Sequence, residues 1–303
     1  MHTITRITVT IEATQTVAWP HFAGSTLRGA VGRALRQAAC ITGQDKCTGC
    51  PLRQSCAYGV VFDPAPPAQP LHPSFQDGQP RYLVQPPALG ACQLSAGQQQ
   101  GFALLLLPGA QAHLPLLEHI MTAATEKQLM QPGQFKLKQL STEEQALAPW
   151  PAAIPEWASS QPDRPAQITL RWLTPLRLQK QGKPIFKPQL LDASTLVRAL
   201  VRRHLQWSQL SAQAPTDTEP QIQAMGHCQL DTRQMRWHDI DRYSSTQQGK
   251  LPLGGLVGSA TLHGPAQALA TLLPLLQRGE QLHLGKEIVM GLGRYQLGAI
   301  EPG

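Results

Sequence analysis

The chain has 303 residues, of which 42% are hydrophobic, and it carries a formal net charge of +7. The length favours two domains, and the basic balance favours a polyanionic partner, nucleic acid before membrane. No run reaches the 18 apolar residues of a membrane span, and the first ten residues lack the apolar segment of a secretion signal, so a cytoplasmic location is expected. Its six cysteines should then stay reduced or bind a metal.

The first half of the chain predicts one β-α-β-β-α-β unit. Residues 25–39 have helical spacing of apolar residues with Ser25 as N-cap. A proline-rich stretch over 64–73 predicts an exposed loop. Strands are predicted over 4–13, 81–85, 102–107 and 135–140, with a second helix over 112–128. This order is typical of a ferredoxin-like domain.

The second half predicts the same order of elements. Strands are predicted over 168–173 and 256–262, helices over 190–209 and 266–278, a hairpin of 227–230 with 234–237, and a final strand or hairpin over 282–297. The intervening residues 146–166 are rich in Pro, Ala and Ser and predict a linker. The predicted fold is therefore α+β, with two tandem ferredoxin-like domains over 1–145 and 167–303.

Four cysteines with the spacing C-x6-C-x2-C-x5-C predict a metal-binding insert at 40–58 in the first domain. The candidate ligands are Cys40, Cys47, Cys50 and Cys56. Four thiolates around one zinc ion make a closed structural site with no open position for water, so no catalytic role is predicted. An iron–sulfur cluster also takes four cysteines, and four free thiols are the remaining interpretation. Cys92 and Cys228 are predicted to be small core residues.

Basic residues dominate residues 164–211, where nine Lys and Arg stand against one acid, Asp192. Arg198 and Arg202 lie four apart on one helical face, where like charges repel unless an anion lies between them. This face is interpreted either as a solvated surface or as a phosphate-binding surface. The excess of basic over acidic residues favours phosphate binding. The predicted RNA contacts here are Arg177, Lys180, Lys183, Lys187, Arg198, Arg202 and Arg203. Because aromatic residues are only 5%, recognition by phosphate contacts and hairpin shape is expected rather than stacking of many bases.

Two glycine-rich segments and the first helix add further candidates. GGLVG covers 254–258, and GKEIVMGLGRY covers 285–295. Glycine lets a backbone approach a phosphate or another backbone closely. The further predicted RNA contacts are Gly291, Gly293, Arg294, Arg242 and the helix residues Arg28, Arg33 and Arg36.

Four stretches together resemble a known family. They are FAGSTLRGAVGRALRQAAC (22–40) with CAYGVVFDP (56–64), LTPLRL (173–178), DRYSSTQQGKLPLGGLVGSATLHG (241–264) and LHLGKEIVMGLGRYQL (282–297). In this order they resemble the CRISPR-associated endoribonucleases of the RAMP superfamily that process precursor CRISPR RNA, the Cas6 family, in its subgroup with a four-cysteine module. The resemblance implies two RRM-like domains facing each other with RNA in the groove between them.

The resemblance also implies a metal-independent reaction, in which a 2′-hydroxyl attacks the adjacent phosphate and leaves a 2′,3′-cyclic phosphate. The product guide RNA would be retained and passed to other CRISPR effector subunits. A non-catalytic subunit that binds the guide RNA and a general RNA-binding protein are the alternatives.

Such a reaction needs a base, an acid and a cation for the developing phosphorane charge. His21, between the first strand and the first helix, is the first candidate, and its alternative is a surface histidine. Tyr243 is a candidate acid or phosphate-orienting group, or a core tyrosine. Lys286 is a candidate cation, or a binder of backbone phosphate. His238 and His283 alternate with strand residues, and either could face the groove.

Overall fold

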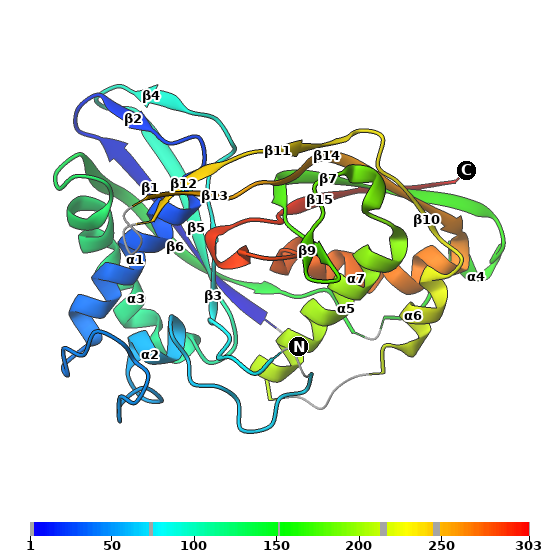
Figure 1. Cartoon of the computed structure of the whole chain (residues 1–303), viewed down its shortest axis with the longest axis horizontal. Helices are drawn as coiled ribbons and strands as arrows, with labels where there is room; N and C mark the ends of the chain where they lie inside the picture. The colour runs from blue at the N-terminus through cyan, green and yellow to red at the C-terminus, as the bar shows by residue number, and fades with distance from the viewer. Residues whose placement is uncertain (1–2, 73–74, 151, 213–216, 245–248, 303) are drawn as a thin grey trace.

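The computed structural model describes residues 3–72, 75–150, 152–212, 217–244 and 249–302, without the side chains of 241–252 and of residue 302. Two β-sheet bodies lie side by side, each with helices packed on its sheet (Figure 1). The predicted α+β class is confirmed, and the two bodies repeat one order of elements along the chain.

The first body is an antiparallel four-stranded sheet of order β3-β5-β1-β6. Its strands are β1 (Thr3–Ala13), β3 (Tyr82–Gln85), β5 (Gln99–Leu106) and β6 (Phe135–Ala146). Apolar side chains at every second position of β1 pack against α1 (Gly24–Ala39) and α3 (Leu114–Ala123), because alternate residues of a strand point to one face. α3 continues as a π-helical segment, Ala124–Gln128.

The second body has the order β10-β14-β7-β15, with β11 also paired to β14. Its strands are β7 (Pro165–Leu176), β10 (Gln229–Asp231), β11 (Met235–His238), β14 (Gly255–Pro265) and β15 (Tyr295–Pro302). α5 (Ala193–Leu210) and α7 (Ala266–Leu282) contribute their apolar faces to its core. When β10 and β11 are counted as one interrupted strand, because both pair with β14, the strands of both sheets numbered along the chain lie in the order 2-3-1-4.

Shorter elements complete the described fold. They are β2 (Val17–Trp19), α2 (Ala57–Val61), β4 (Cys92–Leu94), α4 (Glu156–Ser159), β8 (Gln179–Lys180), β9 (Lys183–Pro184), α6 (Glu219–Met225), β12 (Asp241–Ser244), β13 (Gly249–Pro252), and the 3₁₀ turns Gln111–His113, Pro188–Leu190 and Ile288–Met290. The predicted linker, 146–166, contains α4 and the first two residues of β7. Among the described residues, no helix combines the length and apolar character that a membrane span needs.

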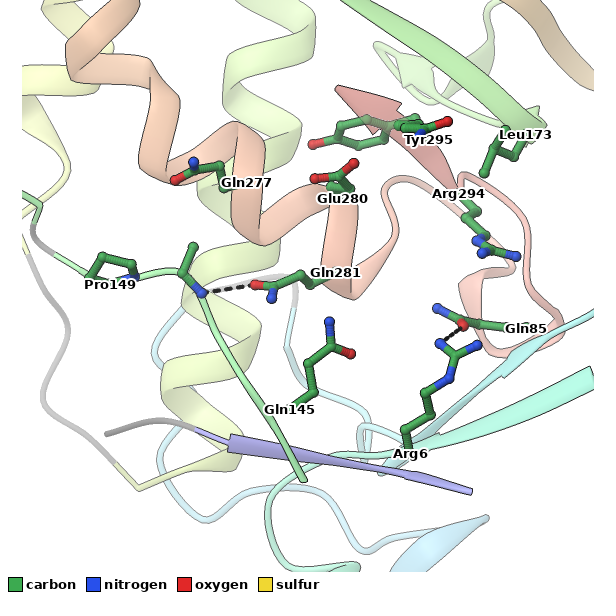
Figure 2. Close-up of a pocket in the computed structure, with 12 residues that line it drawn as sticks. Arg6, Gln85, Gln145, Pro149, Leu173, Gln277, Glu280, Gln281, Arg294 and Tyr295 are labelled. Atoms are coloured by element: carbon green, nitrogen blue, oxygen red, sulfur yellow. Dashed lines mark hydrogen bonds between the residues drawn. The ribbon is translucent and has the colours of Figure 1, made fainter. Parts of the chain in front are cut away.

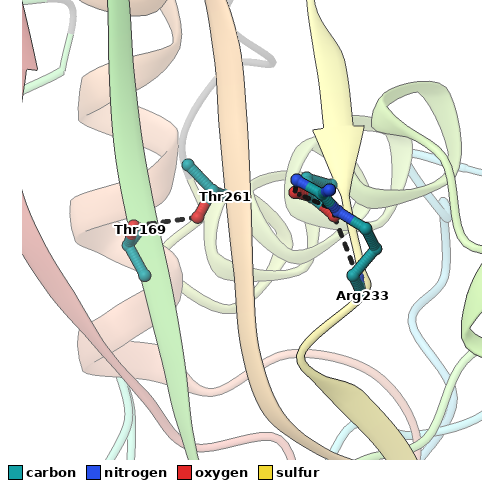
Figure 3. Close-up of polar contacts among 4 residues, drawn as sticks. Thr169, Arg233 and Thr261 are labelled. Carbon is teal, nitrogen blue, oxygen red and sulfur yellow. Dashed lines mark hydrogen bonds and ion pairs between the residues drawn. The ribbon is translucent and has the colours of Figure 1, made fainter.

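The predicted hairpin of 227–230 with 234–237 is wrong. β10 and β11 do not pair with each other, because both run antiparallel to the same strand, β14, one after the other. The break between them is a polar turn, in which Arg233 folds back onto the carboxylate of Asp231 with contacts of 2.6–3.0 Å (Figure 3). On the neighbouring strands, the hydroxyls of Thr169 and Thr261 meet at 3.0 Å (Figure 3).

Two local predictions also need correction. α1 begins at Gly24 with Ala23 at the N-cap, and no side chain caps it, so Ser25 lies inside the helix. Cys228 is buried as predicted, but Cys92 is exposed in the short strand β4.

Two apolar clusters join the bodies. In the first cluster, the ends of α5 and α7 pack against the face of the first sheet that α1 and α3 do not cover. Its members include Ile4, Leu83, Leu105, Trp207, Leu210 and Leu282. The second cluster is Phe22, Ile240, Leu253, Met290 and Leu292. It brings the start of α1, the end of β11 and the glycine-rich segment 285–295 to one place.

Candidate active site at the junction of the two bodies

His21 stands immediately before α1, on the side of the first body that meets the second. Its side chain is exposed, and the next residue, Phe22, is buried in the junction cluster. The backbone carbonyl of His21 accepts a hydrogen bond from the amide of Gly90 at 3.0 Å. The burial of Phe22 and this bond therefore hold the backbone at His21 while the imidazole faces solvent.

His238, the last residue of β11, meets His21 across the junction. Their Nε2 atoms lie 2.8 Å apart, and the ring centroids are 5.1 Å apart. Ile240, two residues after His238, is buried in the same cluster as Phe22. The sequence pattern identified His21 but left His238 and His283 equivalent, and only the contact distinguishes His238.

The contact between the two imidazoles needs one donor and one acceptor. Burial lowers the pKa of His238 below its ordinary value, and the neighbouring charges of His21 and Arg236 lower it further, while Asp239 acts in the opposite direction. A neutral His238 is therefore the acceptor, and His21 is the donor. Arg236 lies two residues before His238 on β11, so both side chains point to one face of the strand, and Arg236 is exposed there.

Arg236 was missed in the sequence because nothing distinguished it from other surface arginines. Arg236 can be recognised only by its position, because it shares a strand face with His238. That position becomes informative once the contact of His238 with His21 is known.

The glycines of segment 285–295 serve packing within the protein. Gly291 and Gly293 both have positive φ, +91° and +71°. A Cβ on Gly293 would overlap the backbone oxygen of Leu284, and a Cβ on Gly291 would overlap Pro86 of the first body. Protein atoms thus occupy the sides on which the missing side chains would lie, so packing requires glycine at both positions, and their contact with RNA stays a prediction.

Lys286 and Arg294, at the two ends of this segment, line different cavities. Lys286 lies in a cavity of about 680 Å³ with the predicted RNA contacts Lys180, Arg198 and Arg202. Asp192 also lines it, and its carboxylate pairs with Lys180 at 2.7 Å. This cavity brings together basic residues that are far apart in the sequence.

Arg203 lines the same cavity and also has a structural role. Its side chain is buried, and its Nε donates to the backbone oxygen of Leu282 at 3.0 Å. Burial lowers its pKa to about 10. Arg203 therefore holds the end of α7, and its contact with RNA stays a prediction.

Arg294 lines a second cavity, of about 540 Å³, together with Arg6 and Gln85 (Figure 2). Arg6 donates to Gln85 Oε1 at 2.5 Å, and the Gln85 amide nitrogen lies 3.3 Å from His283 Nε2. His283 is fully buried, and its pKa falls to about 3, mainly through burial. It therefore supports Gln85 as a neutral core residue and does not face the groove.

The predicted arginines of α1 bond within the first body. Arg28 donates to the Tyr82 hydroxyl at 2.9 Å, Arg33 bonds Gln128, and Arg36 bonds the backbone oxygen of Gln44. In the second body, Arg177 similarly donates to the Gly254 oxygen at 3.0 Å. These bonds give each arginine a structural role, and their contact with RNA stays a prediction.

The remaining predicted residues fall into two groups. Lys183 and Lys187 are exposed on the segment that follows β7. Arg242 and Tyr243 lie in β12, whose backbone pairs with β13, but their side chains are outside the described part of the structure. Their predicted roles are untested.

The four cysteines lie on one loop around one small cavity, between α1 and α2. The hydroxyl of Thr42 lies 3.8 Å from the sulfur of Cys40 and 3.7 Å from that of Cys50. Hydrogen bonds from Gly43 and Thr42 lower the pKa of Cys40, whereas burial and Asp63 raise that of Cys47. Across the described residues, no three metal-ligating side chains are close enough to hold an ion as they stand.

Two protein-family models match this chain. The AF_1859_N family model, described as an N-terminal domain, matches residues 2–158, and the model for CRISPR-associated endoribonuclease Cas6 matches residues 170–295. No curated protein matches the sequence.

Solved structures share the fold at low identity. Two Cas6 product complexes are each 16% identical, with a TM-score of 0.56, and they cover 98% and 97% of this chain and 100% of their own. Cas6 from Thermus thermophilus is 15% identical, with a TM-score of 0.50 over 97% of this chain and 98% of its own. A partial Cas6-RT-Cas1–Cas2 complex is 14% identical, with a TM-score of 0.55 over 98% of this chain and 46% of its own. The two family models together account for most of the chain: its N-terminal half is an AF_1859_N domain, and residues 170–295 form a domain of the CRISPR-associated endoribonuclease Cas6 family.

Proposed function

We propose that this Cas6 protein cleaves CRISPR repeat RNA without a metal ion, at the histidine pair formed by His21 and His238. The observation that carries the proposal is the 2.8 Å contact between their Nε2 atoms, on an exposed surface beside Arg236. Two imidazoles and a guanidinium are the groups that transesterification of RNA requires.

We assign the role of base to His238 because its pKa is lowered, and the role of acid to its partner His21. Neutral His238 accepts the proton of the 2′-hydroxyl at Nε2, and the freed oxygen attacks the adjacent phosphorus. The bond from phosphorus to the 5′-oxygen breaks, and His21, as imidazolium, gives that oxygen its proton. The products are a 2′,3′-cyclic phosphate and a 5′-hydroxyl, with no water consumed. Arg236 would stabilise the phosphorane charge, a role that the sequence suggested for Lys286.

The path of the RNA is proposed from charge. Lys180, Arg198, Arg202 and Lys286 surround one cavity, where two helical like charges and a lysine favour a phosphate. Such contacts would retain the guide RNA after cleavage. We assign the two bodies as ferredoxin-like domains of the RAMP type and place the RNA at their junction. The solved Cas6 product complexes and the Cas6 assembly with RT, Cas1 and Cas2 name the partners to test for this protein.

We also propose that the cysteine loop binds one structural zinc ion. All four sulfurs border one cavity, and N–H groups already stabilise the Cys40 thiolate, as a bound thiolate requires. The loop would close by small movements of Cys47 and Cys56. Metal analysis of purified protein checks this: we expect one zinc per chain, lost in Cys47→Ser, whereas iron with a visible chromophore would indicate a cluster and a folded, metal-free sample would refute both.

The function is tested with repeat RNA in EDTA. We expect the wild type to cleave at one position and leave a cyclic phosphate, and His21→Ala and His238→Ala each to lose at least 10²-fold in single-turnover rate, the usual contribution of acid–base groups. The matched controls are His119→Ala and His227→Ala, because both histidines are exposed on the two bodies and neither contacts the pair.

Three other outcomes separate the alternatives. Tight binding of repeat RNA without cleavage by the wild type would indicate a non-catalytic guide-binding subunit. Equal binding of repeat and unrelated RNA would indicate a general RNA-binding protein. Full cleavage by both histidine variants would refute the site while leaving the function standing.

A further inference from the structure

One exposed aromatic ring stands in the basic loop between β7 and α5. Phe186 is 55% exposed, although it is preceded by Ile185, which is only 2% exposed. The Ile185 amide bonds the Leu178 oxygen at 3.0 Å, and the Pro188 oxygen accepts a hydrogen bond from Thr232 at 3.1 Å. The backbone is thus tied on both sides of a ring that the core does not cover.

Trp237 supports this ring from β11. The centroids of Phe186 and Trp237 are 4.7 Å apart at an interplanar angle of 57°, and the indole nitrogen donates to Asp239 at 2.7 Å. A Cβ on Gly254 would overlap the indole, so the glycine-rich segment 254–258 leaves room for it. The two rings form a fixed apolar surface, which we name the Phe186–Trp237 platform.

The platform lies beside the basic loop on the core-facing side of β11. Trp237 directly precedes His238, so its side chain points to the opposite face of the strand from His238. Toward the other end of the same loop, Lys180 and Gln181 line the cavity that holds Arg198 and Lys286. Lys183 and Lys187, on either side of Phe186 in the sequence, are exposed, and neither forms an ion pair within the described residues. A polyanion that leaves the cavity along this loop would therefore meet Phe186 between two exposed lysines.

Resting on the proposed function, we propose that the Phe186–Trp237 platform stacks one unpaired nucleobase of the bound repeat RNA. Aromatic rings bind single-stranded RNA by stacking on splayed-out bases, and a base inside a helix is already stacked on its neighbours. A basic loop with one fixed, exposed ring suits this ligand better than it suits a protein partner, because lysines attract phosphate while the ring takes the base.

The test uses repeat RNA with a 2′-deoxy nucleotide at the scissile position and 2-aminopurine at each flanking position in turn. Stacking quenches 2-aminopurine fluorescence, so we expect quenching at one unpaired position with wild-type protein. Phe186→Ala should abolish that quenching and weaken binding roughly 5- to 100-fold, the range for loss of one stacked base. Phe186→Trp should restore both, and Leu190→Ala, which removes another exposed apolar side chain of the loop (53% exposed), should change neither.

The outcomes separate this inference from the function on which it rests. If wild type binds and cleaves repeat RNA but Phe186→Ala shows the same quenching and affinity, the platform is overturned and the function stands. If wild type neither binds nor cleaves repeat RNA, both fall. A Phe186→Ala defect equal on a blunt, fully paired RNA duplex of the same sequence would also overturn the inference, because no unpaired base is then present.

Discussion

At the residue scale, the chemistry depends on two imidazoles that restrain each other's protonation. The Nε2 atoms of His21 and His238 lie 2.8 Å apart, so a positive charge on one ring opposes a positive charge on the other. Arg236 adds a positive charge close to His238. Together with burial, these charges lower the pKa of His238 and favour its neutral form, which a general base requires.

The charge on Arg236 gives a pH prediction. In Arg236→Gln, removal of the positive charge should raise the pKa of His238 toward its ordinary value, because the cation no longer opposes protonation. The acid limb of the single-turnover rate should then move to higher pH, and the plateau rate should fall through loss of the cation. Rates measured from pH 4 to 9 check both effects.

A matched control isolates this effect. Arg233 is exposed on the same strand region and pairs with Asp231, so Arg233→Gln should leave the acid limb in place. An unshifted limb in Arg236→Gln would show that Arg236 does not act on the base.

At the scale of elements, the glycine-rich segment 285–295 acts as a wedge between the two bodies. Its backbone bonds β7 through Gly293 N to Pro175 O at 2.9 Å and Lys286 N to Arg177 O at 2.8 Å. Met290 and Leu292 insert into the cluster with Phe22. The segment therefore positions His21 indirectly, through the packing of Met290 and Leu292 against the neighbouring residue Phe22.

The wedge predicts an asymmetry between two glycines. Gly293→Ala should lower the free energy of unfolding by about 1–3 kcal/mol or more, because φ is positive and the new methyl would overlap the Leu284 oxygen. Gly298→Ala, on β15, should change it far less, since its nearest neighbour is at an ordinary 3.4 Å. Chemical denaturation checks both, and equal effects would show that segment 285–295 tolerates side chains.

At the scale of the whole molecule, the site exists only while the two bodies stay packed. His21 belongs to the first and His238 to the second, and the two apolar clusters of the junction hold them together. A loosened junction should therefore cost activity as well as stability, because both histidines must reach one phosphate.

Leu282 is the test of this coupling. It is 1% exposed at the end of α7, in the cluster that includes Ile4 and Leu83 of the first body. Leu282→Ala should lower the free energy of unfolding by about 2–5 kcal/mol and reduce the cleavage rate at temperatures where the protein is still folded. Leu190→Ala, on the surface, should stay within about 0.5 kcal/mol. Undiminished cleavage by a destabilised Leu282→Ala would show that the junction does not position the site.

Much of the fold could be predicted from local patterns. Alternation along 4–13 and helical spacing along 25–39 report which side of each element is buried, so both were placed within a residue or two. The order of elements in both bodies follows from such patterns. The interrupted strand β10–β11 was misread as a hairpin because a polar turn has similar residues in both cases, and only β14 shows that the two segments share one partner.

The sequence by itself determined the α+β class and the order of elements, because both depend on neighbours along the chain, and it offered His21 as a candidate. The tertiary structure alone decided that His238 joins His21 across 217 residues, that Lys286 and Arg294 face separate cavities, and that Gly291 and Gly293 accommodate protein backbone. The physical reason is that those contacts arise where two bodies pack, and packing depends on the combined surfaces of distant segments rather than on the period of any one of them.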